Sequence, residues 1–167
     1  MQENRAMEIL KSAMLLEMRG KAFYRTAAAQ ASNAAIKQFF EVMADEEDYH
    51  IQVLSEQYKS VKEGGSFKDG GYGDKSGEDV ASAVLDAAVR EKIESAGFES
   101  AAIQAAMAME ERAVKLYGER AAETQDPEER KLYQWLSDWE NGHLKILMDM
   151  DRELTEKIWH DNQFWPF

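Results

Sequence analysis

The stretch Glu47-Asp48-Tyr49-His50 has a counterpart in Glu140-Asn141-Gly142-His143, and both follow the pattern Glu-x-x-His. The two stretches are 93 positions apart, since residue 47 falls on residue 140. The same offset places Glu17 on Glu110, and the apolar residues around both stretches agree in kind. A repeat at one fixed offset indicates two copies of a structural unit. We therefore expect one such unit around each Glu-x-x-His stretch.

Apolar residues around both motifs recur every three or four positions, which is typical of α-helices. Two turns interrupt this pattern. One lies at Ser32 and Asn33, where Asn33 is a suitable N-cap, and the other at Gln125-Asp126-Pro127, where proline takes the first helical position. The sequence thus predicts four long helices, over about residues 3–31, 34–63, 99–124 and 127–159.

The connection between the second and third helices is long, covering about residues 64–98. Residues 64–77 hold six of the ten glycines, and a short extra helix is predicted at about residues 79–95. Such a crossover makes the second and third long helices run parallel. We therefore predict an all-α fold, a four-helix bundle of two helical hairpins, as a single domain over residues 1–167.

Composition narrows the functional classes. The chain has 167 residues and 19.0 kDa, the size of one ordinary domain, and its 44% of hydrophobic residues are enough for a sizeable core. Its net charge of -12 disfavours binding to nucleic acid or to an anionic membrane surface. The absence of cysteine excludes disulfides, catalytic thiols and iron–sulfur clusters. Without a recognisable signal peptide or membrane span, we expect a cytoplasmic protein.

Four glutamates are expected at one depth of the bundle. Glu17 and Glu47 lie 15 positions on either side of Ser32. At a rise of about 1.5 Å per residue, both sit roughly 22 Å from the first turn. Glu110 and Glu140 are placed in the same way about the second turn. All four carboxylates can therefore meet in a single layer.

Two histidines join these glutamates on the apolar faces. Glu47 and His50 are three residues apart and share one face of a helix, and so do Glu140 and His143. Unpaired carboxylates in a bundle core would cost several kcal/mol each or take up protons. Two divalent cations would cancel the four charges and use both imidazoles. This donor set suits iron, manganese or mixed metals, and zinc is possible but inert to redox. The alternative is a metal-free bundle with buried polar residues. The candidate metal ligands are Glu17, Glu47, His50, Glu110, Glu140 and His143.

The motifs resemble those of the ferritin-like superfamily and, within it, of the rubrerythrin-like di-iron carboxylate proteins. They are Glu17–Tyr24 and Asp45–His50 in the first hairpin, and Glu110–Tyr117 and Trp139–His143 in the second. The likeness covers about residues 3–157. It implies a ferritin-like four-helix bundle around a centre of two iron ions, here without the rubredoxin domain of rubrerythrins.

The resemblance also implies roles for the six candidate ligands, which would be the catalytic residues as well. The terminal ligands would be Glu17 and Glu110, the bridging ligands Glu47 and Glu140, and the nitrogen donors His50 and His143.

Two functions stay open under this resemblance. Rubrerythrins reduce hydrogen peroxide, so one interpretation is a di-iron oxidoreductase that reduces peroxide or oxygen at a Glu4His2 centre in oxidative stress. Its electrons would come from a separate donor protein, because the cysteine-rich rubredoxin tail is missing. The alternative is a ferroxidase of bacterioferritin type that oxidises and sequesters Fe(II). Ala113 stands where rubrerythrins carry a further glutamate, and the remaining six-residue set resembles that of bacterioferritin.

Two further features carry weaker expectations. Tyr24 and Tyr117 lie two turns beyond Glu17 and Glu110 on the same helix faces. These tyrosines could hydrogen-bond the ligand carboxylates at the cofactor site or relay an electron. The alternative is that they only pack in the core. The tail, residues 158–167, holds four aromatic residues. We expect it to pack on the bundle or on a second subunit of a homodimer or larger homo-oligomer.

Overall fold

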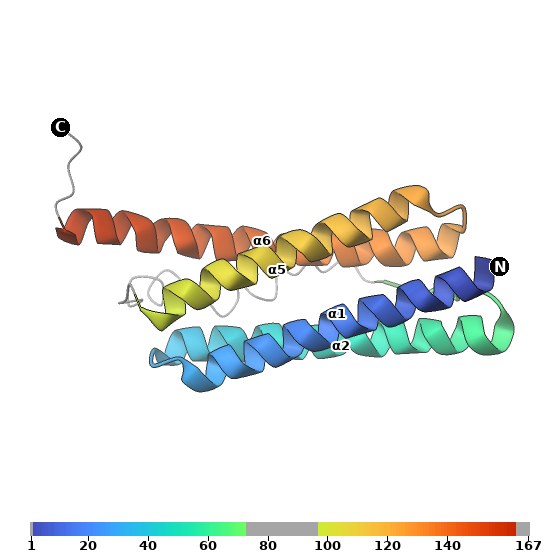
Figure 1. Ribbon diagram of the computed structural model, residues 1–167, viewed down its shortest axis with the longest axis horizontal. Helices are drawn as coiled ribbons and strands as arrows, with labels where there is room; N and C mark the ends of the chain where they lie inside the picture. The colour runs from blue at the N-terminus through green and yellow to red at the C-terminus, as the bar shows by residue number, and fades with distance from the viewer. Residues whose placement is uncertain (1, 73–96, 163–167) are drawn as a thin grey trace.

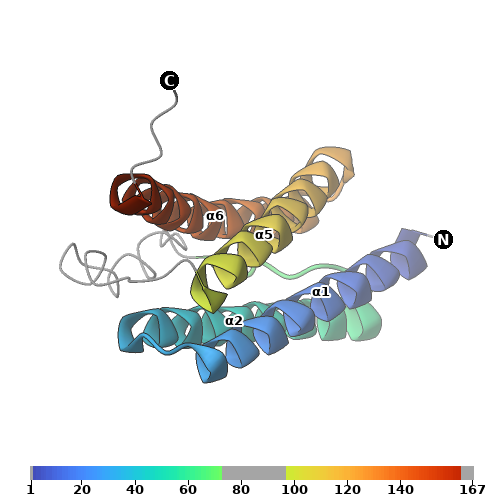
Figure 2. The same cartoon turned by 60° about the vertical axis from the view of Figure 1, so that its left-hand side comes forward.

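The computed structural model describes residues 2–72 and 97–162. This part of the chain consists of four α-helices and contains no strand: α1 (Gln2–Gln30), α2 (Ala34–Gly64), α5 (Phe98–Glu123) and α6 (Pro127–Asn162). α1 packs along α2 and α5 along α6, and α2 and α5 run in the same direction (Figure 1). Figure 2 shows the two hairpins as two layers of one bundle. The predicted all-α four-helix bundle is confirmed.

The predicted helix ends agree with the structure to within three residues. The largest difference is at the end of α6, which continues to Asn162 instead of fraying near Trp159. No proline or glycine stands between these residues, and the first helix breaker is Pro166. The predicted short helix at about residues 79–95 and residues 163–167 of the aromatic tail lie outside the described residues.

The helix caps agree with the sequence pattern. The Oδ1 atom of Asn33 accepts hydrogen bonds from two backbone N–H groups in the first turn of α2, at 2.9 and 3.2 Å. The Oδ1 atom of Asp126 accepts two such bonds at the start of α6, at 2.8 and 3.1 Å. α2 ends at Gly65, whose φ of 74° is a left-handed conformation that glycine adopts without strain. These caps fix the two hairpin turns and thereby the depth of each helix.

The apolar core is divided into two clusters, one in each half of the bundle. The half that contains the α1–α2 turn includes Tyr24, Phe39, Phe40, Met43, Ile103 and Leu147. The other half includes Leu10, Leu54, Tyr117, Leu132, Tyr133 and Leu136. The layer between them is occupied by buried polar side chains. No described helix combines the length and the apolar composition needed to cross a lipid bilayer.

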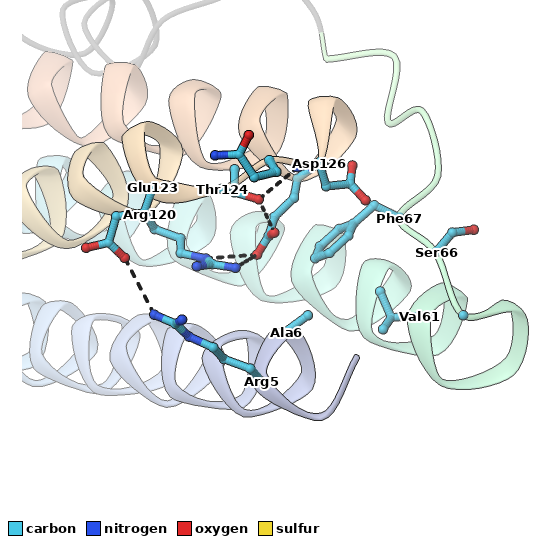
Figure 3. A pocket seen from close by; sticks show the side chains of 12 residues that line it. Arg5, Ala6, Val61, Ser66, Phe67, Arg120, Glu123, Thr124 and Asp126 are labelled. Atoms are coloured by element: carbon cyan, nitrogen blue, oxygen red, sulfur yellow. Dashed lines mark hydrogen bonds and ion pairs between the residues drawn. The ribbon is translucent and has the colours of Figure 1, made fainter. Parts of the chain in front are cut away.

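A buried ion pair closes the end of the bundle where α5 turns into α6 (Figure 3). The Nε and Nη2 atoms of Arg120 donate to Oε1 of Glu129 at 2.9 and 2.6 Å, and Thr124 donates to the other oxygen of the same carboxylate. Arg5 of α1 approaches Glu123 at 3.8 Å on the surface above this pair. Removing one partner of such an ion pair would leave the other charge buried without compensation, which is strongly destabilising. The α5–α6 turn is therefore held by charge as well as by packing.

Candidate metal centre

The six predicted side chains lie together between the two apolar clusters. They come from all four helices, and none exposes more than 3% of its surface. They form two groups in which one donor atom of each residue lies within 4.8 Å of the others. The groups are Glu17, Glu47, His50 and Glu140, and Glu47, Glu110, Glu140 and His143. Glu47 and Glu140 belong to both, so the two groups share an edge made of carboxylates.

Both histidines turn the same nitrogen toward this shared edge. The Nδ1 atom of His50 lies 2.9 Å from Glu140, 3.1 Å from Glu17 and 3.5 Å from Glu47. The Nδ1 atom of His143 lies 3.0 Å from Glu140 and 3.5 Å from Glu110. A neutral imidazole with an unprotonated Nδ1 is a ligand for divalent iron, manganese or zinc. The donor atoms therefore converge on two neighbouring positions.

The buried carboxylates and histidines of the centre shift one another's pKa values. Burial and the neighbouring Glu140 raise the pKa of Glu47 well above its usual range, and they raise that of Glu110 to about 8. Burial opposes ionisation of Glu140 too, but contacts with His50 and His143 outweigh it and lower its pKa. For both histidines the acidic neighbours outweigh burial and raise the pKa. Without metal, the site holds protons.

These properties fit a pair of divalent cations. Two cations would replace the bound protons, balance the four carboxylates and use both Nδ1 atoms as neutral donors. The Oε1 atom of Glu140 is fully buried and lies 2.9 Å from Nδ1 of His50. A carboxylate oxygen and an imidazole nitrogen held this close are donors that one metal ion could share.

Tyr24 and Tyr117 each hydrogen-bond a carboxylate of the opposite hairpin. Tyr24 of α1 donates to Oε1 of Glu110 on α5, and Tyr117 of α5 donates to Oε1 of Glu17 on α1. Both side chains are fully buried, and burial together with the nearby carboxylates raises both pKa values well above the usual range. Their hydroxyls therefore stay protonated as donors. The pair ties the two hairpins together at the level of the cluster.

Glu46 is a further buried carboxylate beside the centre and is not among the predicted residues. Its Oε2 atom accepts a hydrogen bond from Nε1 of Trp139 at 2.8 Å and contacts Nε2 of His143. Only 7% of its surface is exposed. The signal was present in the sequence, because Glu46 lies three residues after Met43 and four before His50, the spacing of the buried face of α2.

A cavity of about 300 Å³ opens between α1 and α5 and reaches the cluster. Its inner lining includes four of the carboxylates, Glu17, Glu47, Glu110 and Glu140. Small residues flank these carboxylates: Gly20 on α1 and Ala113 at the equivalent position of α5. A larger cavity of about 760 Å³ lies beside the Arg120 ion pair (Figure 3) and includes none of the six side chains. Only the smaller of these two cavities leads to the candidate centre.

Comparison with protein families agrees with this geometry. The family model described as Rubrerythrin matches residues 8–150, which span all four helices and every residue of the cluster. The searches of curated proteins and of solved structures returned no significant match. Since the family match covers most of the chain, this protein belongs to the rubrerythrin family and carries its ferritin-like di-iron domain.

Proposed function

We propose that this protein is a di-iron oxidoreductase that reduces hydrogen peroxide, or oxygen, with electrons from a separate donor protein. The observation that carries the proposal is the buried set of four carboxylates and two imidazoles, arranged as two groups with a shared edge. Glu17, Glu47, His50 and Glu140 would hold one ion, and Glu47, Glu110, Glu140 and His143 the other. When bound, two ferrous ions supply the two electrons that, with two protons, convert one peroxide molecule into two water molecules.

The side chains of the chain itself would prepare this reaction. Tyr24 and Tyr117 fix the carboxylates of Glu110 and Glu17 through hydrogen bonds from opposite hairpins. A ligand held in this way keeps its orientation while substrate enters and leaves. The apolar clusters above and below the polar layer restrict water to the approach between α1 and α5. These features favour a centre that reacts with a small molecule over one that only stabilises the fold.

The approach itself supports peroxide over a cation as the substrate. Arg19 and Arg112 line the cavity between α1 and α5, and both are exposed residues at equivalent positions of the repeat. Beside the four carboxylates deeper in the same cavity, these two guanidinium groups would weaken the attraction for repeated entry of Fe(II), whereas neutral peroxide is little affected. The competing function, a ferroxidase that sequesters iron, is favoured by one observation. Ala113 leaves a six-residue set that resembles the bacterioferritin centre.

One experiment separates these functions. The purified protein is loaded with Fe(II) under anaerobic conditions, its iron content is determined, and it is then mixed rapidly with hydrogen peroxide or oxygen. About two irons per chain, with oxidation faster by peroxide than by oxygen, would support the proposal. Uptake of many irons per chain would support the ferroxidase function. Unchanged iron content in Glu140→Ala would refute the proposed ligand set, with Glu129→Gln as a control because that buried carboxylate lies at the end of the bundle.

A further inference from the structure

The two histidines of the centre have similar surroundings on one side and different surroundings on the other. On the Nδ1 side, each ring faces the shared carboxylates, with Glu140 at 2.9 Å from His50 and 3.0 Å from His143. Each ring also contacts a residue of the opposite hairpin that directly precedes the glutamate of a Glu-x-x-His stretch: residue 46 contacts Nε2 of His143, and residue 139 packs edge to face with His50. The repeat makes these two residues equivalent in position, because residue 46 falls on residue 139. These residues are Glu46 and Trp139, so the two copies of the repeat differ in the residue that contacts the histidine of the other copy.

His143 has a carboxylate behind it. The Nε2 atom of His143 contacts Oε2 of Glu46, and both residues are buried. The indole N–H of Trp139 donates to the same oxygen at 2.8 Å and holds the carboxylate in this position. An imidazole that donates its outer N–H to a carboxylate has a fixed tautomer, with Nδ1 free for a metal, and is a stronger donor to that metal.

His50 packs against aromatic rings and has no such carboxylate at Nε2. Trp135 and Trp139 meet the imidazole edge to face, with ring centroids 5.4 and 5.5 Å away. The Nε2 atom of His50 is buried and has no hydrogen-bond partner in the part of the chain that the structure describes. Among the described residues, no acceptor at Nε2 fixes the tautomer of this ring or strengthens its Nδ1 atom as a donor. The two ligand groups therefore contain the same kinds of residue but histidines of different donor strength.

We propose that the two metal positions are inequivalent, with the position served by His143 binding its ion more tightly and filling first. Glu46 is then a positioning residue that acts through His143. Trp139 orients Glu46 and occupies the position of the repeat at which His50 would otherwise have a carboxylate partner. This inference rests on the metal centre proposed above. Loss of such a partner lowers metal affinity about 10- to 100-fold in comparable sites. We expect the two positions to differ by a factor of that order.

The test is an anaerobic titration of the metal-free full-length protein with Co(II), followed by visible absorption and calorimetry. We expect two binding steps, the first tighter than the second. Glu46→Ala should weaken the first step about 10- to 100-fold and leave the second within about threefold. His143→Ala should abolish the tight step, whereas His50→Ala should leave it in place. Glu46→Gln keeps an acceptor oxygen without its charge and should fall between the parent protein and Glu46→Ala.

A second readout distinguishes positioning from a general effect on folding. With one equivalent of Co(II), proton NMR should show one shifted imidazole N–H signal that exchanges slowly with water, and Glu46→Ala should make its exchange fast. Glu129→Gln removes another buried carboxylate and should change neither binding step. Equal weakening of both steps by Glu46→Ala, or no weakening, would overturn the inference while leaving the metal centre intact. Absence of any Co(II) binding would overturn both proposals.

Discussion

Three buried tyrosines offer a matched test of the hydrogen bonds around the centre. Tyr24 and Tyr117 donate to Glu110 and Glu17, whereas the hydroxyl of Tyr133 is buried without a hydrogen-bond partner among the described residues. All three side chains are fully buried and belong to the apolar clusters. Replacement by phenylalanine removes the same single oxygen in each case. The three substitutions therefore differ chiefly in what that oxygen contacts.

The structure sets the expected magnitudes. A hydrogen bond from a neutral donor to an ionised carboxylate contributes about 1.5–3 kcal/mol. Tyr24→Phe and Tyr117→Phe should each lower the free energy of unfolding of the metal-loaded protein by about that amount. For a domain of this size, the melting temperature should fall by roughly 3–12 °C. Tyr133→Phe removes a hydroxyl that pays a desolvation cost without compensation, so it should be neutral or raise the stability by up to about 1–3 kcal/mol.

The assay is urea unfolding of the parent and the three variants at one saturating metal concentration, because bound metal adds to stability by mass action. A double-mutant cycle of Tyr24→Phe with Glu110→Gln isolates the pair, and its coupling energy should be about 1 kcal/mol or more. Two results would refute the reasoning. One is a loss in Tyr133→Phe as large as that in Tyr24→Phe. The other is a coupling energy of zero between Tyr24 and Glu110.

Three further predictions concern pH, the ion pair and the entrance. Because the pKa of Glu110 is raised from 4.5 to about 8, the folded metal-free protein keeps a proton there that the unfolded chain loses. The stabilising contribution of this proton is complete below pH 4.5 and is lost as the pH rises through about 8. In urea unfolding between pH 6.5 and pH 9, the free energy of unfolding should therefore fall by up to about 1.4 kcal/mol per pH unit for each such proton. The metal-loaded protein should not show this decline. Glu129→Ala leaves the largely buried guanidinium of Arg120 unpaired and should cost about 3–5 kcal/mol in unfolding experiments without changing the metal content; a loss below about 1 kcal/mol would be incompatible with the ion pair. A Cβ atom at Gly20 would lie 3.4 Å from Cδ of Glu47. Gly20→Val should therefore slow the oxidation of bound iron by peroxide about tenfold or more in stopped flow, whereas Gly64→Val, at a position with open space, should not. Equal rates in both variants would exclude this entrance.

The fold and the six clustered side chains followed from the sequence because one repeat encodes both. Each helix pair is symmetric about a capped turn, so equal distances along the chain become equal depths in the bundle. The Glu-x-x-His spacing then fixes direction, since residues three apart share a face. Position along the axis and direction around it are enough to bring Glu17, Glu47, Glu110 and Glu140 together with the two histidines.

Features that depend on the neighbouring helix could not be predicted in the same way. The same-face spacing of Tyr24 and Glu17 pointed to the ligand carboxylates in general, but the structure pairs Tyr24 with Glu110 of the opposite hairpin. The spacing within one helix does not say which helix lies beside it. Glu46 has the spacing of the buried face of α2, but its acidic neighbours obscure that signal. It stands in the run Asp45-Glu46-Glu47-Asp48, where three acidic neighbours make a solvated face the simpler interpretation, and its equivalent Trp139 is not acidic.

The cavity between α1 and α5 is bordered by two small residues at equivalent positions of the repeat. Gly20 and Ala113 are equivalent positions on α1 and α5, and they lie three residues after Glu17 and Glu110. Rubrerythrins place a further glutamate where Ala113 stands, and such a side chain would extend into the cavity that is present here. A bundle with large residues at both positions would seal the carboxylates in the core, where they could only stabilise or strain the fold. With a hydrogen atom and a methyl group there, the same carboxylates border a cavity of about 300 Å³. The arrangement leaves a cavity between α1 and α5 that reaches the centre, as the proposed reaction with a small molecule requires.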